Sequence, residues 1–178
     1  MRWLMTVIRR MRRHPLLAIS LGAVLSLGVL SRCCADRQIA INTSHSVPPG
    51  LYVRSDEEPR IGCLIDFKVP EAARDYLRSR TGSEGHDWYI LKPIIAGPGD
   101  RVDTTGEWLI INGRRIALMP PPRDAEGRGL PVWREARTLG PAEFFVFSGR
   151  IAHSFDGRCY GPVTRAQISS VRRPLFTW

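Results

Sequence analysis

The segment DWYILKPIIA at positions 87–96 is the most apolar stretch outside the N-terminal region, and it is followed by a Pro-Gly-Asp turn at 98–100. A run of this length, rich in isoleucine and aromatic residues, is typical of a buried strand. Lys92 lies at its centre. Burial would lower the pKa of an ammonium group from about 10.4 and make a neutral amine available as a base. The alternative is an edge-strand lysine whose ammonium group reaches water.

Short strands are predicted on both sides of this segment. Runs rich in β-branched and aromatic residues predict further strands at 39–43, 51–54, 63–69 and 143–147. Asn112-Gly113 between two apolar runs predicts a hairpin over 108–118, and Pro70 begins a surface helix expected at 71–80. We expect a loop-rich insertion at 119–142 and a polar loop at 148–160. The sequence therefore predicts a mainly β domain.

Composition excludes disorder and gives no support for nucleic-acid binding. The chain has 178 residues, 43% hydrophobic and 24% charged, which is ordinary for a globular domain. Its net charge of +9 is concentrated in residues 1–15, which carry five arginines and no acid. The remaining residues carry 21 basic against 17 acidic side chains. We expect no nucleic-acid partner.

The N-terminal region predicts a membrane anchor. Positions 14–31 carry no formal charge if His14 is neutral, and Arg32 ends the stretch. At about 1.5 Å per residue, this length is near the minimum for crossing a hydrocarbon layer of ~30 Å. The arginines before it predict a cytoplasmic segment at 1–15 and a transmembrane signal-anchor at 16–32, with the remainder exported. A cleavable signal peptide is the alternative, whereas Arg32 disfavours lipidation of Cys33.

Two further segments carry polar groups suited to chemistry. In NTSHSVPPGLY at 42–52, Ser46 precedes a rigid Pro-Pro-Gly turn, which can hold a nucleophile or form a plain loop. In SGRIAHSFDGRCYGPV at 148–163, Ser154, Asp156 and Arg158 offer a hydroxyl, a carboxylate and a guanidinium within five residues. An Asp–Arg pair that only braces the loop is the alternative.

In their order and spacing, these three segments resemble the conserved boxes of the type I signal peptidases, which are membrane-anchored serine proteases with a Ser/Lys dyad. The resemblance implies a signal-peptidase-like β-sheet domain in the periplasm at 36–178, with a variable insertion at about 104–142. It also implies an inner-membrane protein with a single pass. By position, it implies the following roles: Ser46 as nucleophile, Lys92 as general base, Ser44 in the oxyanion hole, Ser154 as support for the lysine, and Asp156 and Arg158 as braces.

At three positions the sequence departs from the common form of these boxes, and there it resembles the conjugal transfer peptidase branch (TraF type). Val47 follows the nucleophile position, Pro93 follows Lys92, and Asp-Asn is missing before Arg150. In that branch the aspartate at the position of Asp156 is implied to be functionally required. The implied substrate is a membrane-associated precursor, the pilin of a conjugative type IV transfer system. The residues do not separate hydrolysis from cyclisation of the product.

Other interpretations stay open at this point. These are a general type I signal peptidase, a non-catalytic membrane-anchored component of a secretion apparatus, and a Ser/His protease using His45 or His153. The sequence lacks a Gly-x-Ser-x-Gly elbow, and this absence counts against the Ser/His protease. The cysteines and histidines lack metal-ligand spacing, so we expect neither a metal nor a cofactor. Cys63 and Cys159 could form a disulfide in the periplasm.

Overall fold

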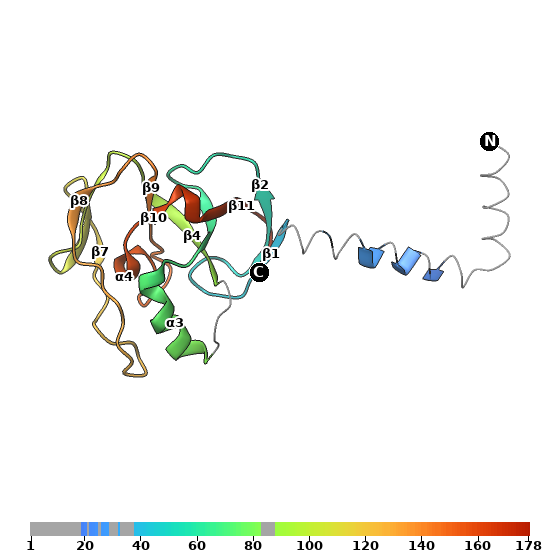
Figure 1. Cartoon of the computed structure of the whole chain (residues 1–178), viewed down its shortest axis with the longest axis horizontal. Coiled ribbons are helices and arrows are strands. Elements are labelled where there is room, and N and C mark those ends of the chain that lie inside the picture. The colour runs from blue at the N-terminus through green and yellow to red at the C-terminus, as the bar shows by residue number, and fades with distance from the viewer. Residues whose placement is uncertain (1–18, 21, 25, 29–31, 33–37, 83–87) are drawn as a thin grey trace. The chain divides into compact units, whose positions relative to one another are not determined.

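The computed structural model describes residues 19–20, 22–24, 26–28, 32, 38–82 and 88–178 (Figure 1). The chain divides into two units, 1–39 and 40–178. In the first unit the described residues before position 38 are helical, and Ser26 Oγ donates to the Gly22 carbonyl at 2.8 Å. No helix among the described residues is both long enough and apolar enough to cross a membrane. The predicted segment 1–15 and parts of the predicted anchor 16–32 lie outside the described residues.

The second unit is built around a large β-sheet. In the described chain, its strands follow the order β1-β2-β11-β3-β4-β9-β10, and the pairs from β2 onward are antiparallel. Their bounds are β1 (Ile39–Asn42), β2 (Gly50–Ser55), β3 (Leu64–Lys68), β4 (Tyr89–Ala96), β9 (Glu143–Val146), β10 (Val163–Thr164) and β11 (Ile168–Thr177). The strands predicted around positions 87–96 are therefore confirmed. The long strand β11, which lies inside the sheet, was not predicted.

A smaller sheet has the order β7-β6-β5-β8. Its strands are β5 (Arg101–Asp103), β6 (Trp108–Ile111), β7 (Arg114–Leu118) and β8 (Ala136–Thr138). The predicted hairpin is confirmed, since Asn112 and Gly113 have φ of 50° and 79° between paired strands. The loop predicted at 119–142 is partly wrong, because β8 pairs with β5. Figure 1 shows β7 and β8 at one end of the unit and β1 and β2 at the other.

Helices cover one part of the large sheet. The helix predicted at 71–80 is confirmed as η1 (Glu71–Ala73) followed by α3 (Arg74–Thr81), and it ends where Gly82 adopts a φ of 64°. The loop predicted at 148–160 ends instead in a short helix, α4 (Gly157–Tyr160). The Asp156 carboxylate caps α4 by accepting the Arg158 N–H, and this local bond explains the difference. A further short helix, η2 (Arg165–Gln167), precedes β11.

The main core lies between the large sheet and these helices. Ile65, Phe67 and Ile94 are at most 1% exposed and face the same cluster as Tyr76 of α3. The ring of Tyr76 packs against that of Phe155, with 4.9 Å between centroids. The same cluster contains Cys63 and Cys159, both as free thiols, so the structure has no disulfide between them. Packing in this core places the loop after β9 beside the centre of β4.

Candidate active site

The loop between β1 and β2 holds the serine expected to be the nucleophile. Ser46 is 5% exposed, its Oγ lies 3.2 Å from Ser44 Oγ, and its carbonyl accepts a hydrogen bond from Ser148 Oγ. The turn after Ser46 is tied down as well, because Tyr52 Oη donates to the Pro48 carbonyl at 2.5 Å. A side chain at Gly50 would collide with the carbonyl oxygen of Phe176 on β11. Contacts within this loop, from Ser148 and from β11 therefore hold Ser46 in a fixed position.

Lys92 lies in the middle of β4, opposite Ile65 of β3, and is only 3% exposed. Its Nζ donates to Ser154 Oγ at 2.9 Å. Burial lowers the pKa of Lys92 from 10.5 to about 8, and the nearby Asp156 carboxylate acts in the opposite direction. With this pKa, about one molecule in ten carries a neutral amine at pH 7. The expectation of a buried lysine is confirmed, and the edge-strand alternative is wrong.

Asp156 and Arg158 form a buried ion pair next to this lysine. The Arg158 guanidinium donates from Nε to Asp156 Oδ1 at 2.9 Å and from Nη2 to Oδ2 at 3.0 Å. Its remaining donor, Nη1, binds the Leu118 carbonyl at the end of β7 at 2.7 Å. The guanidinium carbon also lies 4.7 Å from the centre of the Phe147 ring. The pair therefore joins α4, β7 and the end of β9 into one rigid unit.

The predicted site residues are linked by a continuous series of contacts. The series begins at Ser46, whose carbonyl accepts from Ser148 Oγ, and the Ser148 N–H donates to Asp156 Oδ2 at 3.4 Å. Asp156 is paired with Arg158, whose Nη2 donates to the Ser154 carbonyl at 3.3 Å. The series ends where Ser154 Oγ accepts from Lys92 Nζ. Among the described residues, no hydrogen bond joins Ser46 Oγ directly to Lys92 Nζ. The expected nucleophile and the expected base thus belong to one buried network, in which no hydrogen bond of the described residues joins them directly.

Two members of the site were missed by sequence reasoning. Asn42 accepts from and donates to the loop that carries Ser46, and Ser148 connects this loop to Asp156. Both residues lie inside the quoted segments, but nothing in their spacing distinguishes them from ordinary loop residues. Ser148 follows directly after the predicted core strand at 143–147, and this position is the one signal that could have identified it.

Other candidate nucleophiles and bases are less suitable. His45 and His153 are exposed, whereas Ser46 and Lys92 are buried. Burial raises the pKa of the Cys159 thiol to about 12, so this thiol stays protonated and unreactive at neutral pH. The arrangement therefore favours a serine attack assisted by Lys92 over one assisted by histidine.

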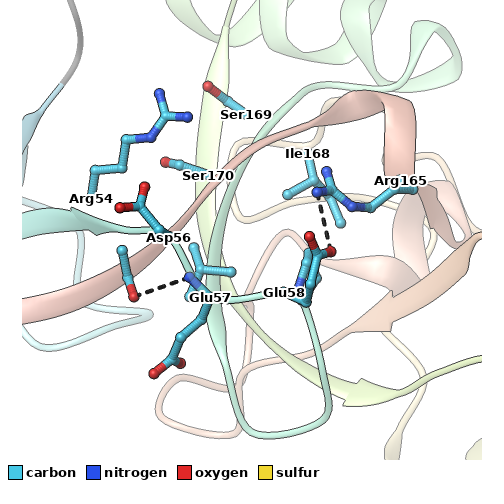
Figure 2. A pocket seen from close by; sticks show the side chains of 11 residues that line it. Arg54, Asp56, Glu57, Glu58, Arg165, Ile168, Ser169 and Ser170 are labelled. Carbon is cyan, nitrogen blue, oxygen red and sulfur yellow. Dashed lines mark hydrogen bonds and ion pairs between the residues drawn. The ribbon is translucent and has the colours of Figure 1, made fainter.

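A polar pocket of about 200 Å³ lies elsewhere, between the segment after β2 and the start of β11 (Figure 2). It contains none of the predicted site residues. Its lining carries both signs of charge, and Arg165 Nη2 lies 3.3 Å from Glu58 Oε2. Serines and carboxylates both line this pocket, but among the described residues none of its serine hydroxyls is hydrogen-bonded to one of its carboxylates. The Ser46–Lys92 region therefore remains the candidate active site.

The chain is similar to several known proteins. Residues 12–176 match the family model of signal peptidase, peptidase S26. The chain is 33% identical over 181 residues to a plasmid transfer protein TraF of Escherichia coli, covering 96% of this chain and 99% of the relative. It is 27% identical over 177 residues to a conjugal transfer protein TraF of Agrobacterium tumefaciens (strain 15955), covering 94% and 99%. Among solved structures, a signal peptidase I of Enterococcus faecalis V583 is similar, with a TM-score of 0.39 and 18% sequence identity. The match covers 66% of this chain and 98% of that structure's chain.

Proposed function

The chain belongs to the signal peptidase family S26 and is a serine peptidase of the signal peptidase I type, and on this premise we propose that Ser46 is its nucleophile and Lys92 its general base. We further propose that it processes an exported, membrane-associated precursor, the pilin of a conjugative type IV transfer system. The observation that carries the proposal is Lys92 itself. It is buried, has a pKa lowered to about 8, and is held by Ser154 within the network that includes Ser46.

The proposed reaction uses these groups in the following order. The Ser46 hydroxyl turns from Ser44 toward Lys92, and the neutral amine takes its proton as Oγ attacks the substrate carbonyl. The Ser46 backbone N–H stabilises the negative oxygen, and the Ser44 hydroxyl joins it when its proton turns from Asn42 Oδ1 to the substrate oxygen. Protonated Lys92 then gives its proton to the leaving amine, which leaves an acyl group on Ser46. Lys92 finally deprotonates the second nucleophile, either water or the amino terminus of the substrate.

The surrounding polar groups set the state of the lysine. Ser154 Oγ accepts from Nζ and fixes its direction. The Asp156 carboxylate opposes the effect of burial and keeps the pKa of Lys92 from falling further. Arg158 holds this carboxylate in place, and no step of the reaction requires the Arg158 guanidinium to lose a proton. Asp156 therefore acts on catalysis through Lys92 and through the position of Ser148.

The proposed substrate is supported by the relatives. Those with nearly complete coverage are named plasmid or conjugal transfer proteins. A pilin precursor is a substrate that such a system exports, and the acyl-enzyme accounts for either a trimmed or a cyclic product. Mass spectrometry of the product distinguishes the two outcomes, since the cyclic product lacks one molecule of water.

The proposed location is the inner membrane, with a single pass and the catalytic domain in the periplasm. The arginines of residues 1–15 and the uncharged stretch that follows support this orientation. A phosphatase reporter fused after Trp178 is expected to be active, and a fluorescent reporter that matures only in the cytoplasm is expected to be dark at the same position. The opposite pattern would contradict the export of the domain.

Ser46→Ala tests the proposed nucleophile. We expect processing of the precursor to fall by on the order of 10⁴-fold or more, because the variant cannot form the acyl-enzyme. The protein should stay folded, since Ser44 Oγ is the one hydrogen-bond partner of the lost hydroxyl among the described residues. Ser169→Ala, which removes an exposed hydroxyl outside the site, is the matched control and should process normally. A processing rate near wild type for Ser46→Ala would reject the proposed nucleophile.

A further inference from the structure

The side chain of Asn42 is occupied at both ends by the loop that carries Ser46. Asn42 is the last residue of β1 and is 8% exposed. Its Nδ2 donates to the carbonyls of Ser44, Val47 and Pro48 at 3.0, 3.0 and 3.1 Å. Its Oδ1 accepts from Ser44 N at 3.1 Å and from Ser44 Oγ at 2.7 Å. One amide therefore binds loop residues on both sides of Ser46.

These contacts determine the direction of the hydroxyl protons. An amide oxygen can only accept, and a serine hydroxyl has a single proton to give. Ser44 Oγ therefore directs its proton to Asn42 Oδ1. At the 3.2 Å contact between the two serines, Ser44 Oγ must then be the acceptor and Ser46 the donor. Through Ser44, Asn42 thus sets where the Ser46 proton points before a substrate arrives.

The same side chain fixes the backbone of the nucleophile. The carbonyls that Nδ2 binds lie before and after Ser46, so the peptide N–H of Ser46 is held relative to β1. Aspartate has the same shape but no donor for these carbonyls, and alanine has neither group. Asparagine is thus suited to this position because it donates to the carbonyls and accepts from Ser44 at the same time.

We propose that Asn42 is a positioning residue, which fixes the loop backbone on both sides of Ser46 and, through Ser44, keeps the Ser46 hydroxyl beside Ser44 until the substrate arrives. This inference rests on the proposed role of Ser46 as nucleophile. Asn42 does not contact the substrate's reacting atoms in this scheme. It acts by keeping the nucleophile within the narrow range of positions that attack on a carbonyl requires.

The test compares Asn42→Ala, Ser44→Ala and the double variant in the full-length enzyme with purified precursor. We expect Asn42→Ala to lower kcat by about 10²-fold, because a displacement of about 1 Å has an effect of this size. KM should change little, and the apparent pKa of the pH profile should stay at that of wild type, since Asn42 does not contact Lys92. The double variant should be about as slow as Asn42→Ala, because residues that act as a unit are not additive.

Gln167→Ala is the matched control. The Gln167 amide oxygen accepts from Thr164 N and Thr164 Oγ1 at 2.8 and 3.0 Å, which is the same pair of bonds that Asn42 Oδ1 makes with Ser44. This variant should keep its kcat. Thermal denaturation checks that each slow variant is still folded, and Asn42→Asp is the second variant. It preserves the shape and the acceptor but sets a carboxylate oxygen against three carbonyl oxygens, so we expect its kcat to fall at least as far as that of Asn42→Ala.

The inference is overturned if folded Asn42→Ala or Asn42→Asp has the kcat of wild type. It is also overturned if Gln167→Ala is as slow as Asn42→Ala, or if the double variant loses the product of the two single effects. Failure of the proposed function gives a different result, because Ser46→Ala would then stay active. An inactive Ser46→Ala beside a fully active Asn42→Ala rejects only the role of Asn42.

Discussion

Lys92→Arg is expected to be as inactive as Lys92→Ala, although it keeps the positive charge. The proposed reaction needs a neutral amine, and a guanidinium does not give up its proton near neutral pH. Lys92 is only 3% exposed, so the larger arginine head would also have to be accommodated in a packed core. We expect both variants to lose on the order of 10³-fold or more in processing rate, measured with purified precursor.

The chain supplies its own control for this experiment. Lys68 is the other lysine of the sequence, and it lies at the end of β3 outside the site network. Lys68→Arg should process at the wild-type rate. A Lys92→Arg variant with near wild-type activity, combined with an inactive His45→Ala or His153→Ala, would replace the Ser/Lys assignment with a Ser/His enzyme.

The same reasoning gives the pH dependence of the wild-type enzyme. Burial lowers the pKa of Lys92 to about 8, and only the deprotonated form acts as the base. Activity should therefore be low below pH 7, rise through about pH 8 and level off above it. A profile that rises near 10.5, the ordinary value for lysine, would show that burial does not activate Lys92.

The elements predicted correctly are those whose sequence pattern is local. The apolar segment at 87–96, the Asn112-Gly113 hairpin and the helix after Pro70 each contain the information for their own structure. Strand β11 does not. Its sequence ISSVRRPLFT contains two arginines and a proline, and it shows no alternation of apolar and polar residues. Arg172 is buried there because Asp66 of β3 neutralises it, and the register of the strand shifts after Pro174.

The candidate site divides in the same way. Ser46 and Lys92 could be predicted because a rigid turn and an apolar strand surround them in the sequence. Ser148 contacts the Ser46 carbonyl across 102 positions, and this contact exists only once the chain is folded. Asn42 acts within its own loop, but whether its amide faces the loop or the solvent depends on how β1 enters the sheet. The roles of Ser148 and Asn42 thus depend on contacts that form only in the folded chain, and the sequence pattern alone does not predict them.

The described part of the chain contains two buried Asp–Arg pairs, and their comparison separates structure from catalysis. Arg158 Nε lies 2.9 Å from Asp156, and Arg172 Nη2 lies 2.7 Å from Asp66. Asp156→Asn and Asp66→Asn each remove one charge without changing the shape, so each leaves a buried arginine with an uncompensated charge. Such a loss costs about 3–5 kcal/mol in free energy of unfolding. Both variants should therefore unfold at lower temperature by roughly 6–20 °C, as measured by thermal denaturation.

The pH profile is expected to distinguish the two variants. The Asp156 carboxylate raises the pKa of Lys92, while the charge of Arg158 lowers it. Asp156→Asn removes the first effect and leaves the second, so the pKa of Lys92 should fall below about 8 and the rise in activity should move to lower pH. Its maximal rate should also fall, because Ser148 loses a charged acceptor. Asp66→Asn should keep the midpoint close to the wild-type value, since Asp156 is the carboxylate whose charge raises the pKa of Lys92 most. If the two variants had the same midpoint, Asp156 would only brace the loop, and its proposed influence on the general base would be wrong.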